Sequence, residues 1–202
     1  MNQSITAWFL LLLLASAVVA LHVIDLPKYN VPVYSLCTVD TEGNTNMNVI
    51  TYAAAVGIRP TSTWTISLYK TTKSYQNFMA NGFALLQLLD EEHHAGIVPI
   101  LGKQSGKDIN KITKLHEIKT PMTQVATKIF NRNDLKTDHI TVLTNSINII
   151  ALQRKENIEA VNAGDHDVFF CNVINSYITD ASKNNPNRQP LTSQYLRDKN
   201  II

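Results

Sequence analysis

Short strand-like segments separated by turns fill the chain between residues 33 and 69, and they constrain the fold more than any other feature of the sequence. Val33 to Val39 alternates well enough for a strand, and the polar run from Asp40 to Asn44 is typical of a turn. Met47 to Val56 is therefore expected to return as the hairpin partner. Pro60 interrupts the chain before Trp64 to Tyr69, which reads as a third strand. Three strands this close together predict an antiparallel meander.

The following segments predict a mainly β fold with inserted helices. Residues 74–80 read as a short helix that an Asn-Gly pair ends, and Phe83 to Leu89 reads as a strand buried on both faces. Asp90 is expected to cap a further helix, with two glutamates in its first turn. Many short strands with few helices favour a closed barrel over a doubly wound sheet. Later strands are expected at residues 140–143, 147–153 and 168–177, and a loop at 181–190.

Composition places the chain among ordinary globular proteins and excludes some classes of ligand. A chain of 202 residues with 45% hydrophobic side chains can bury a full core as one domain. Its 18 basic and 16 acidic side chains give a net charge of only +2, so no electrostatic footprint for nucleic acid is expected. The sequence contains neither the G-x-G-x-x-G pattern of a dinucleotide fold nor a P-loop.

The two cysteines, Cys37 and Cys171, lie far apart and have no CxxC spacing, so the sequence does not indicate a zinc site. The two cysteines either pack as buried thiols or form one disulfide if the protein enters an oxidising compartment.

The N-terminus reads as a targeting segment that is separate from the fold. Residues 7–21 are apolar, no charged side chain precedes Asp25, and small residues lead up to Ala20. This pattern is typical of a signal peptide over residues 1–20, cleaved after Ala20; an uncleaved membrane anchor is the alternative. The rest of the chain is expected to form one domain over residues 22–202, with a barrel core at about 33–178 and a C-terminal tail at 181–202. We expect routing through the secretory pathway, or to a plastid through a bipartite presequence.

A cluster of lysines and hydroxyl side chains lies where the third strand leads into the first helix, at residues 70–74. Backbone N–H groups at a helix N-terminus, with a lysine nearby, form a natural anion site. A solvated turn with an N-cap is the structural alternative. The segment therefore indicates either a phosphate site or a solvated, capped turn.

Three segments resemble one family. They are MNVITYAAAVGIRPTSTWTISLYKTTKSYQNF from Met47, LGKQSGKDINKI from Leu101, and Gly164-Asp165-His166 followed by DVFFCNV. Together they resemble the flavin reductase-like, FMN-binding split-barrel family, in which a Lys-Thr-x-x-Asn-like helix start and a Ser-Gly-x-Asp-x-x-Lys segment recur. Ser74 stands in place of the family's threonine and keeps a hydroxyl, and Cys171 stands where family members often have glycine.

The resemblance implies an FMN site. Residues of the second strand would line the isoalloxazine ring, and those of the third strand would continue that wall. The helix start would hold the phosphate. The lysine-rich segment from Leu101 would close the site, from the same chain or from a dimer partner. Asn48, Ile50, Thr51 and Tyr52 would line the ring, and Ser67 and Leu68 would continue its wall. Lys73, Ser74 and Asn77 would hold the phosphate, and Lys103 and Ser105 would close the site.

His166 is the single catalytic candidate, because an imidazole near the flavin can orient nicotinamide or relay a proton. Its alternative role is to fix the start of a strand through backbone hydrogen bonds. His93 and His94 are adjacent and lack a partner at i, i+4, so they favour a solvated helix start over a metal site.

The implied function is an NADH- or NADPH-dependent flavin reductase that acts as a homodimer, in which bound FMN accepts hydride and passes electrons onward. A non-enzymatic FMN-binding electron carrier or flavin store is the alternative.

Overall fold

The computed structural model of the protein describes residues 29–202. The expected signal peptide or anchor at residues 1–20 lies outside the described residues. Within the described part, no helix is both long and apolar enough to span a membrane.

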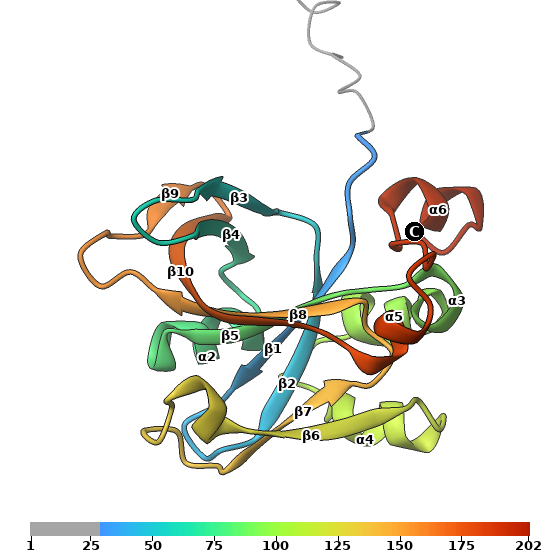
Figure 1. Ribbon diagram of the computed structural model, residues 1–202, viewed down its shortest axis with the longest axis horizontal. Helices are drawn as coiled ribbons and strands as arrows, with labels where there is room; N and C mark the ends of the chain where they lie inside the picture. The colour runs from blue at the N-terminus through green and yellow to red at the C-terminus, as the bar shows by residue number, and fades with distance from the viewer. Residues whose placement is uncertain (1–28) are drawn as a thin grey trace, which may run out of the picture.

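One curled antiparallel sheet dominates the molecule (Figure 1), and its strands follow the order β2-β1-β5-β8-β10-β4-β3, with β9 paired to β10. A separate hairpin, β6–β7, lies below it in Figure 1. The strands are β1 (Tyr34–Val39), β2 (Thr45–Ile50), β3 (Ala53–Gly57), β4 (Thr63–Tyr69), β5 (Phe83–Leu88), β6 (Met122–Ala126), β7 (His139–Leu143), β8 (Asn148–Arg154), β9 (Val161–Ala163) and β10 (His166–Ile178).

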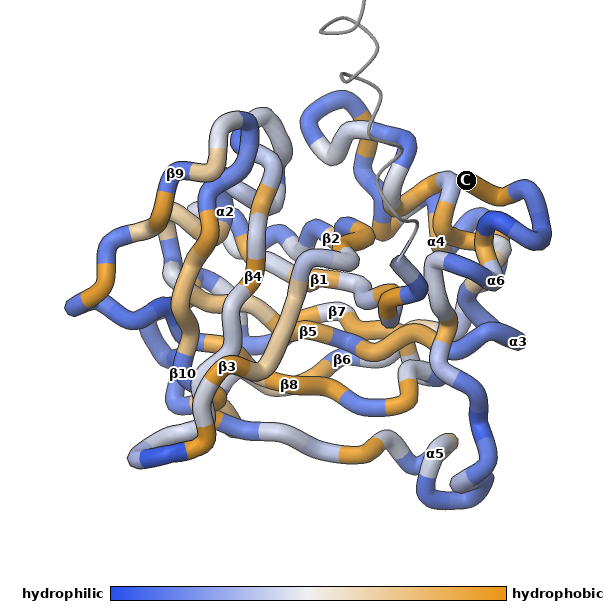
Figure 2. Tube along the Cα trace, turned by 90° about the horizontal axis from the view of Figure 1, so that it is seen from above, coloured by the Kyte–Doolittle hydropathy of each residue, from blue (hydrophilic) through white to orange (hydrophobic). Residues whose placement is uncertain are grey.

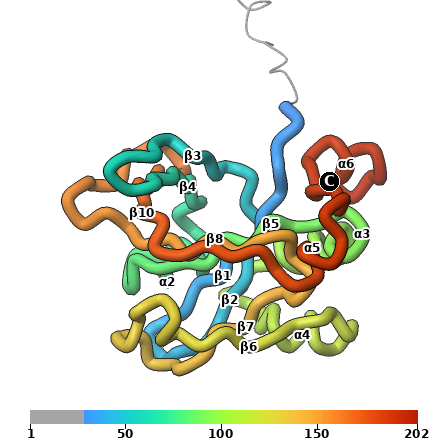
Figure 3. The backbone as a smooth tube through the Cα atoms, in the orientation of Figure 1, coloured from blue at the N-terminus to red at the C-terminus, as the bar shows by residue number. Residues whose placement is uncertain are grey.

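The helices are short and surround this sheet. They are α2 (Lys73–Asn81), α3 (Glu91–His94), the 3-10 turn η1 (Ala95–Ile97), the π-type turn η2 (Pro99–Lys103), α4 (Lys111–Glu117), the 3-10 turn η3 (Thr127–Phe130), α5 (Asp180–Asn184) and α6 (Ser193–Asp198). In the tube view, α3, α5 and α6 gather on one side of the molecule, together with the end of the chain (Figure 3).

The connection between β2 and β3 forces the sheet to curl. These two strands lie at opposite edges of the sheet but are joined only by Thr51 and Tyr52. Three Cα steps span at most about 11 Å, whereas six strand spacings in a flat sheet cover about 28 Å. The backbone N–H of Ser67 donates to the Tyr52 carbonyl at 2.9 Å, which fixes the crossing. The prediction of one return strand from 47 to 56 is therefore wrong, since its halves pair with β1 and β4.

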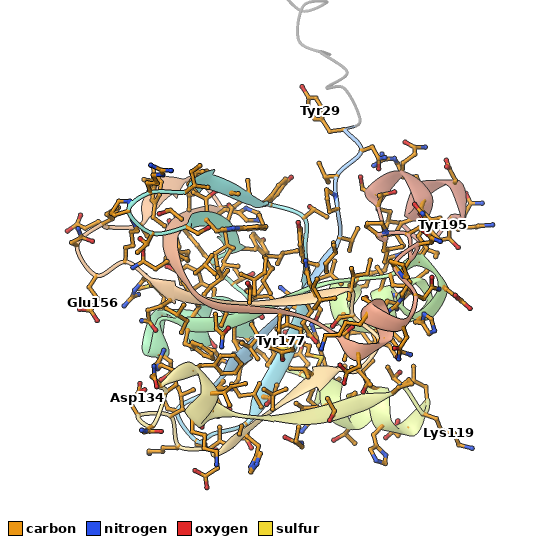
Figure 4. All side chains as sticks on the ribbon, viewed as in Figure 1. Tyr29, Lys119, Asp134, Glu156, Tyr177 and Tyr195 are labelled. Carbon is orange, nitrogen blue, oxygen red and sulfur yellow. The ribbon has the colours of Figure 1, made fainter. Side chains whose placement is uncertain are left out.

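Two hydrophobic cores lie on the two faces of the sheet. The inner core fills the curl with side chains from β1, β4, β5, β8 and β10, and Phe78 of α2 joins it. The outer core lies between the sheet and a cover made by β6–β7, α4 and α6. Figure 2 shows the apolar colouring along β5 and β8 between the two, and Tyr177 packs against the outer core, above the hairpin in Figure 4. The predicted burial of β5 on both faces is confirmed.

Both predicted helix signals are confirmed. Helix α2 begins with Thr72, whose hydroxyl accepts from the N–H of Tyr75 at 3.2 Å, and it ends at Gly82 with a φ of 60°. Asp90 caps α3 by accepting from the N–H of His93 at 2.8 Å. The loop predicted at 181–190 is wrong at its start, because α5 extends to Asn184.

The paired histidines behave differently from the prediction of a solvated helix start. His94 is 2% exposed, and its Nδ1 accepts the backbone N–H of Asp90 at 3.1 Å. Burial lowers its pKa to about 4. His93 remains at the surface and contacts the Asp90 carboxylate at 2.6 Å. Only His93 fits the prediction.

Both cysteines are buried free thiols. Cys37 lies in β1 and Cys171 in β10, with β5 and β8 between these strands. Three strand spacings separate the two backbones by about 14 Å, and a disulfide needs Cα atoms within about 7 Å. The interpretation as packed thiols is confirmed, and the bridge is excluded in this fold.

Candidate functional site

A polar cavity of about 210 Å³ opens where β2, the start of α2 and the residues after η2 meet. Three lysines from different parts of the chain line it, and hydroxyl and amide side chains fill the spaces between them. No acidic side chain contributes to its wall. The hydroxyl and amide residues in the wall are Asn46, Asn48, Thr71, Thr72, Ser74, Gln104 and Ser105, and the lysines are Lys73, Lys103 and Lys111.

The start of α2 supplies donors to this cavity. Ser74 is 1% exposed, and its hydroxyl accepts from the Asn46 amide at 2.9 Å, so the side chain is held in one orientation. Lys73 lies beside it and pairs with Asp40 at 3.2 Å. Because the first N–H groups of a helix have no partner within the helix, this end attracts an anion.

Lys111 is the most unusual group in the cavity. It is 4% exposed, and its ammonium donates to the Leu101 carbonyl. Among residues 29–202, no carboxylate lies within ion-pair distance of it. Burial lowers its pKa to about 8. A buried cation without a counter-charge is unfavourable by itself and becomes favourable when an anion occupies the cavity.

A second and larger cavity, of about 690 Å³, lies on the outside of β3, β4 and the start of β10. Its wall is mainly apolar, and it includes Tyr52, Ala54 and Val168, with Ser67 and His166 as polar members. The two cavities are neighbours, since the ring of Tyr69 lines the first and lies 5.2 Å from the ring of His166 in the second.

His166 is fixed by its surroundings. Its Nδ1 contacts the Asp165 carboxylate at 2.7 Å, and this hydrogen bond lowers the pKa of Asp165. Its ring meets Tyr52 edge to face at 5.7 Å. Lys70 secures the turn before it by donating to the Gly164 carbonyl at 2.7 Å and pairing with Asp167 at 3.2 Å. The Lys70 ammonium is therefore engaged in holding β9 against β10, away from the polar cavity.

The structure divides the sequence-predicted site residues into three groups. Asn48, Lys73, Ser74, Lys103 and Ser105 line the polar cavity. Thr51, Tyr52, Ser67 and His166 line the apolar one.

The third group faces the protein interior. Ile50 and Leu68 are 7% and 1% exposed and belong to the inner core, so only their backbone can meet a ligand. Asn77 lies on the buried face of α2 and donates to the Thr38 hydroxyl at 3.2 Å. These side chains support the walls of the site from behind.

Several lining residues were not predicted. Lys111 belongs to the lysine-rich segment whose family resemblance was recognised, but its burial in the cavity wall depends on distant parts of the chain. Gly106 approaches β2 so closely that an added Cβ would lie 2.2 Å from the Asn46 side-chain oxygen. Tyr69, the aromatic residue between the cavities, ends a strand that was predicted correctly.

The amino-acid sequence matches the flavin reductase like domain over residues 26–195. Since this match covers most of the chain, the protein belongs to that family. No curated protein sequence matches it.

Solved structures share the fold at low sequence identity. The FMN-binding protein from Thermus thermophilus is 14% identical over 77% of this chain and 74% of its own, with a TM-score of 0.59. The styrene monooxygenase flavin reductase from Pseudomonas putida S12 is 14% identical over 81% and 86%, with a TM-score of 0.57. The NADH:FAD oxidoreductase from Streptomyces globisporus, in complex with NAD and FAD fragments, is 12% identical over 81% of both chains, with a TM-score of 0.59. The predicted FMN-binding split-barrel class, mainly β with inserted helices, is confirmed.

Proposed function

We propose that this chain binds FMN across the two neighbouring cavities and uses NADH or NADPH to reduce it. The observation that carries the proposal is the buried, uncompensated ammonium of Lys111 in a cavity whose described wall holds three lysines and no acid. A phosphate monoester is the part of FMN that needs such a site. Membership of the flavin reductase family supports the same conclusion.

The residues present fit both ends of this cofactor. The start of α2, Ser74, Lys73 and Lys111 would hold the dianionic phosphate. The wall beside Tyr52 and Ser67 offers apolar area for a flat ring, together with hydroxyl and backbone groups for its polar edge. Hydride acceptance is the chemistry that a bound flavin supplies.

The protein would contribute orientation and exclusion of water. His166 lies in the wall of the apolar cavity, and its Nδ1 is occupied by Asp165, so Nε2 is the nitrogen free to meet a ligand. It would position the nicotinamide or exchange a proton with bulk water. Hydride transfer itself requires no general base in this arrangement.

The test is a visible spectrum of the purified protein reconstituted with FMN, followed by addition of NADH or NADPH without oxygen. Binding with bleaching by one nicotinamide supports the reductase. Binding without bleaching by either would leave the electron carrier or flavin store. A Lys73→Ala variant with unchanged FMN affinity would show that the start of α2 does not hold the phosphate.

We also propose that two copies of the chain associate through the edge that β3 forms. Val56 of β3 and Ile58, which follows the strand, are 53% and 81% exposed, next to exposed alanines of β3. An apolar, unpaired sheet edge of this kind usually lies against another chain. Sedimentation equilibrium of the wild type and of Ile58→Lys tests this proposal; a wild-type monomer would contradict it.

A further inference from the structure

The ammonium of Lys103, in the wall of the polar cavity, donates to the carbonyl of Ile201 at 2.8 Å. The two residues are 98 positions apart, so this contact joins the cavity to the turn that follows α6. Neither sequence pattern nor family resemblance led us to expect it.

The acceptor in this contact is held rigidly. Asn200 has a φ of 54°, and the N–H of Ile201 donates to the Leu196 carbonyl at 2.9 Å, which closes a Schellman-type end to α6. Leu196 is 1% exposed and belongs to the outer core. The side chain of Ile201 packs against the same core. The position of the Ile201 carbonyl is therefore set by the folded interior.

The backbone of the donor, Lys103, is also held in place. Lys103 ends η2 and directly follows Gly102, which approaches Val49 of β2. Leu101, one residue earlier, is fully buried in the outer core. The backbone of Lys103 and the acceptor of its ammonium thus both belong to the outer-core layer. Only the lysine stem lies between them; it is exposed to solvent, and the hydrogen bond to Ile201 restricts it.

We infer that the turn after α6, at Asn200 to Ile202, positions Lys103 for the phosphate of the bound flavin and so contributes to selection of FMN over unphosphorylated riboflavin. This inference rests on the proposed function. A lysine ammonium has three N–H donors. One is directed to Ile201, which leaves two for a ligand in the cavity. Because this hydrogen bond already restricts the side chain, phosphate binding has less of its freedom to remove.

Selectivity for ligands that carry a phosphate distinguishes a turn that positions Lys103 from a turn that only stabilises the fold. A turn that only stabilised the fold would affect the binding of every flavin. A turn that positions Lys103 affects only ligands that carry a phosphate, and only while the lysine is present.

The test measures FMN and riboflavin affinity by flavin fluorescence for the full chain, for a chain ending at Asn200, and for Lys103→Met with and without that truncation. The truncation should weaken FMN binding about fivefold, leave riboflavin binding unchanged, and have no further effect in the Lys103→Met background. Ile201→Ala keeps the carbonyl and should bind FMN like the wild type.

A chain ending at Ile201 provides a second variant that removes only one exposed residue and keeps the helix end. It converts the acceptor into a carboxylate, which should neutralise Lys103 and weaken FMN binding, again only while Lys103 is present. Equal losses for FMN and riboflavin, a truncation effect that persists in Lys103→Met, or unchanged FMN affinity in both shortened chains would overturn the inference. If the full chain binds neither flavin, the proposed function fails first and the inference fails with it.

Discussion

Replacement of the buried Lys111 by methionine should stabilise the protein and weaken its ligand binding at the same time. Burial lowers the pKa of this lysine from 10.5 to about 8. At 1.36 kcal/mol per unit, keeping it charged in the fold lowers the free energy of unfolding by about 3 kcal/mol. Loss of its hydrogen bond to Leu101 removes about 1 kcal/mol. The expected net gain is about 2 kcal/mol, or roughly 6 °C in Tm for a domain of this size.

The pH dependence of this gain has a defined sign. The folded-state pKa of Lys111 lies below its unfolded value, so the unfolded chain binds more protons between about pH 8 and pH 10.5. The wild type should therefore become more stable as the pH rises through this window. The advantage of Lys111→Met should be complete below about pH 8; above pH 10.5 only the loss of the Leu101 hydrogen bond remains, and the variant should be about 1 kcal/mol less stable than the wild type.

Ligand binding should change in the opposite direction. A charged hydrogen bond to phosphate contributes about 1.5 to 3 kcal/mol, so FMN affinity should fall by about 10- to 150-fold. Thermal melts without ligand and FMN titrations of the same samples measure both effects. Lys107→Met is the matched control, because Lys107 is exposed on the same segment and outside the polar cavity. A Lys111→Met protein that is destabilised below about pH 8, or one with wild-type FMN affinity, would refute the reasoning.

Three further predictions concern the fold and the cavity wall. Phe78→Ala removes a fully buried ring that contacts Phe169 in the inner core, and it should lower the free energy of unfolding by about 3–5 kcal/mol in urea titrations; a loss below about 1 kcal/mol would contradict the packing described. Because burial lowers the pKa of His94 to about 4, stability should fall as the pH drops from 6.5 to 4, by up to about 3 kcal/mol. His94→Asn should flatten that profile, and an unchanged profile would exclude His94 as its source. Gly106→Ala places a Cβ against Asn46 and should weaken FMN binding in titrations, whereas wild-type affinity would show that the segment adapts freely.

The strands were predictable where one local pattern determined them. The residues of β1, β4, β5, β7, β8 and β10 carry enough apolar alternation or β-branched character, and the Asp40 turn and the Thr72 to Gly82 helix carry their own end signals. The division between β2 and β3 could not be predicted in this way. Both halves read as strand, and the pairing partner of each is set by distant residues.

The site was partly predictable for a related reason. Polar residues at the start of α2 and in the segment after η2 line one cavity, although Ser74 and Lys111 are buried in its wall. Leu68 shares a strand face with Ile66 and lies in the inner core, whereas the family resemblance suggested a position in the ring wall. The burial of Lys111 depends on how α4 packs against η2 and β2, which no local pattern reports.

The flavin itself is the central claim. The most direct measurement is titration of the purified protein with FMN, read by fluorescence and by the visible spectrum, followed by anaerobic addition of NADH and NADPH. We expect saturable FMN binding that Lys111→Met weakens, and bleaching of the bound flavin by one of the two nicotinamides. A protein that remains colourless and binds no FMN at any concentration would contradict the account.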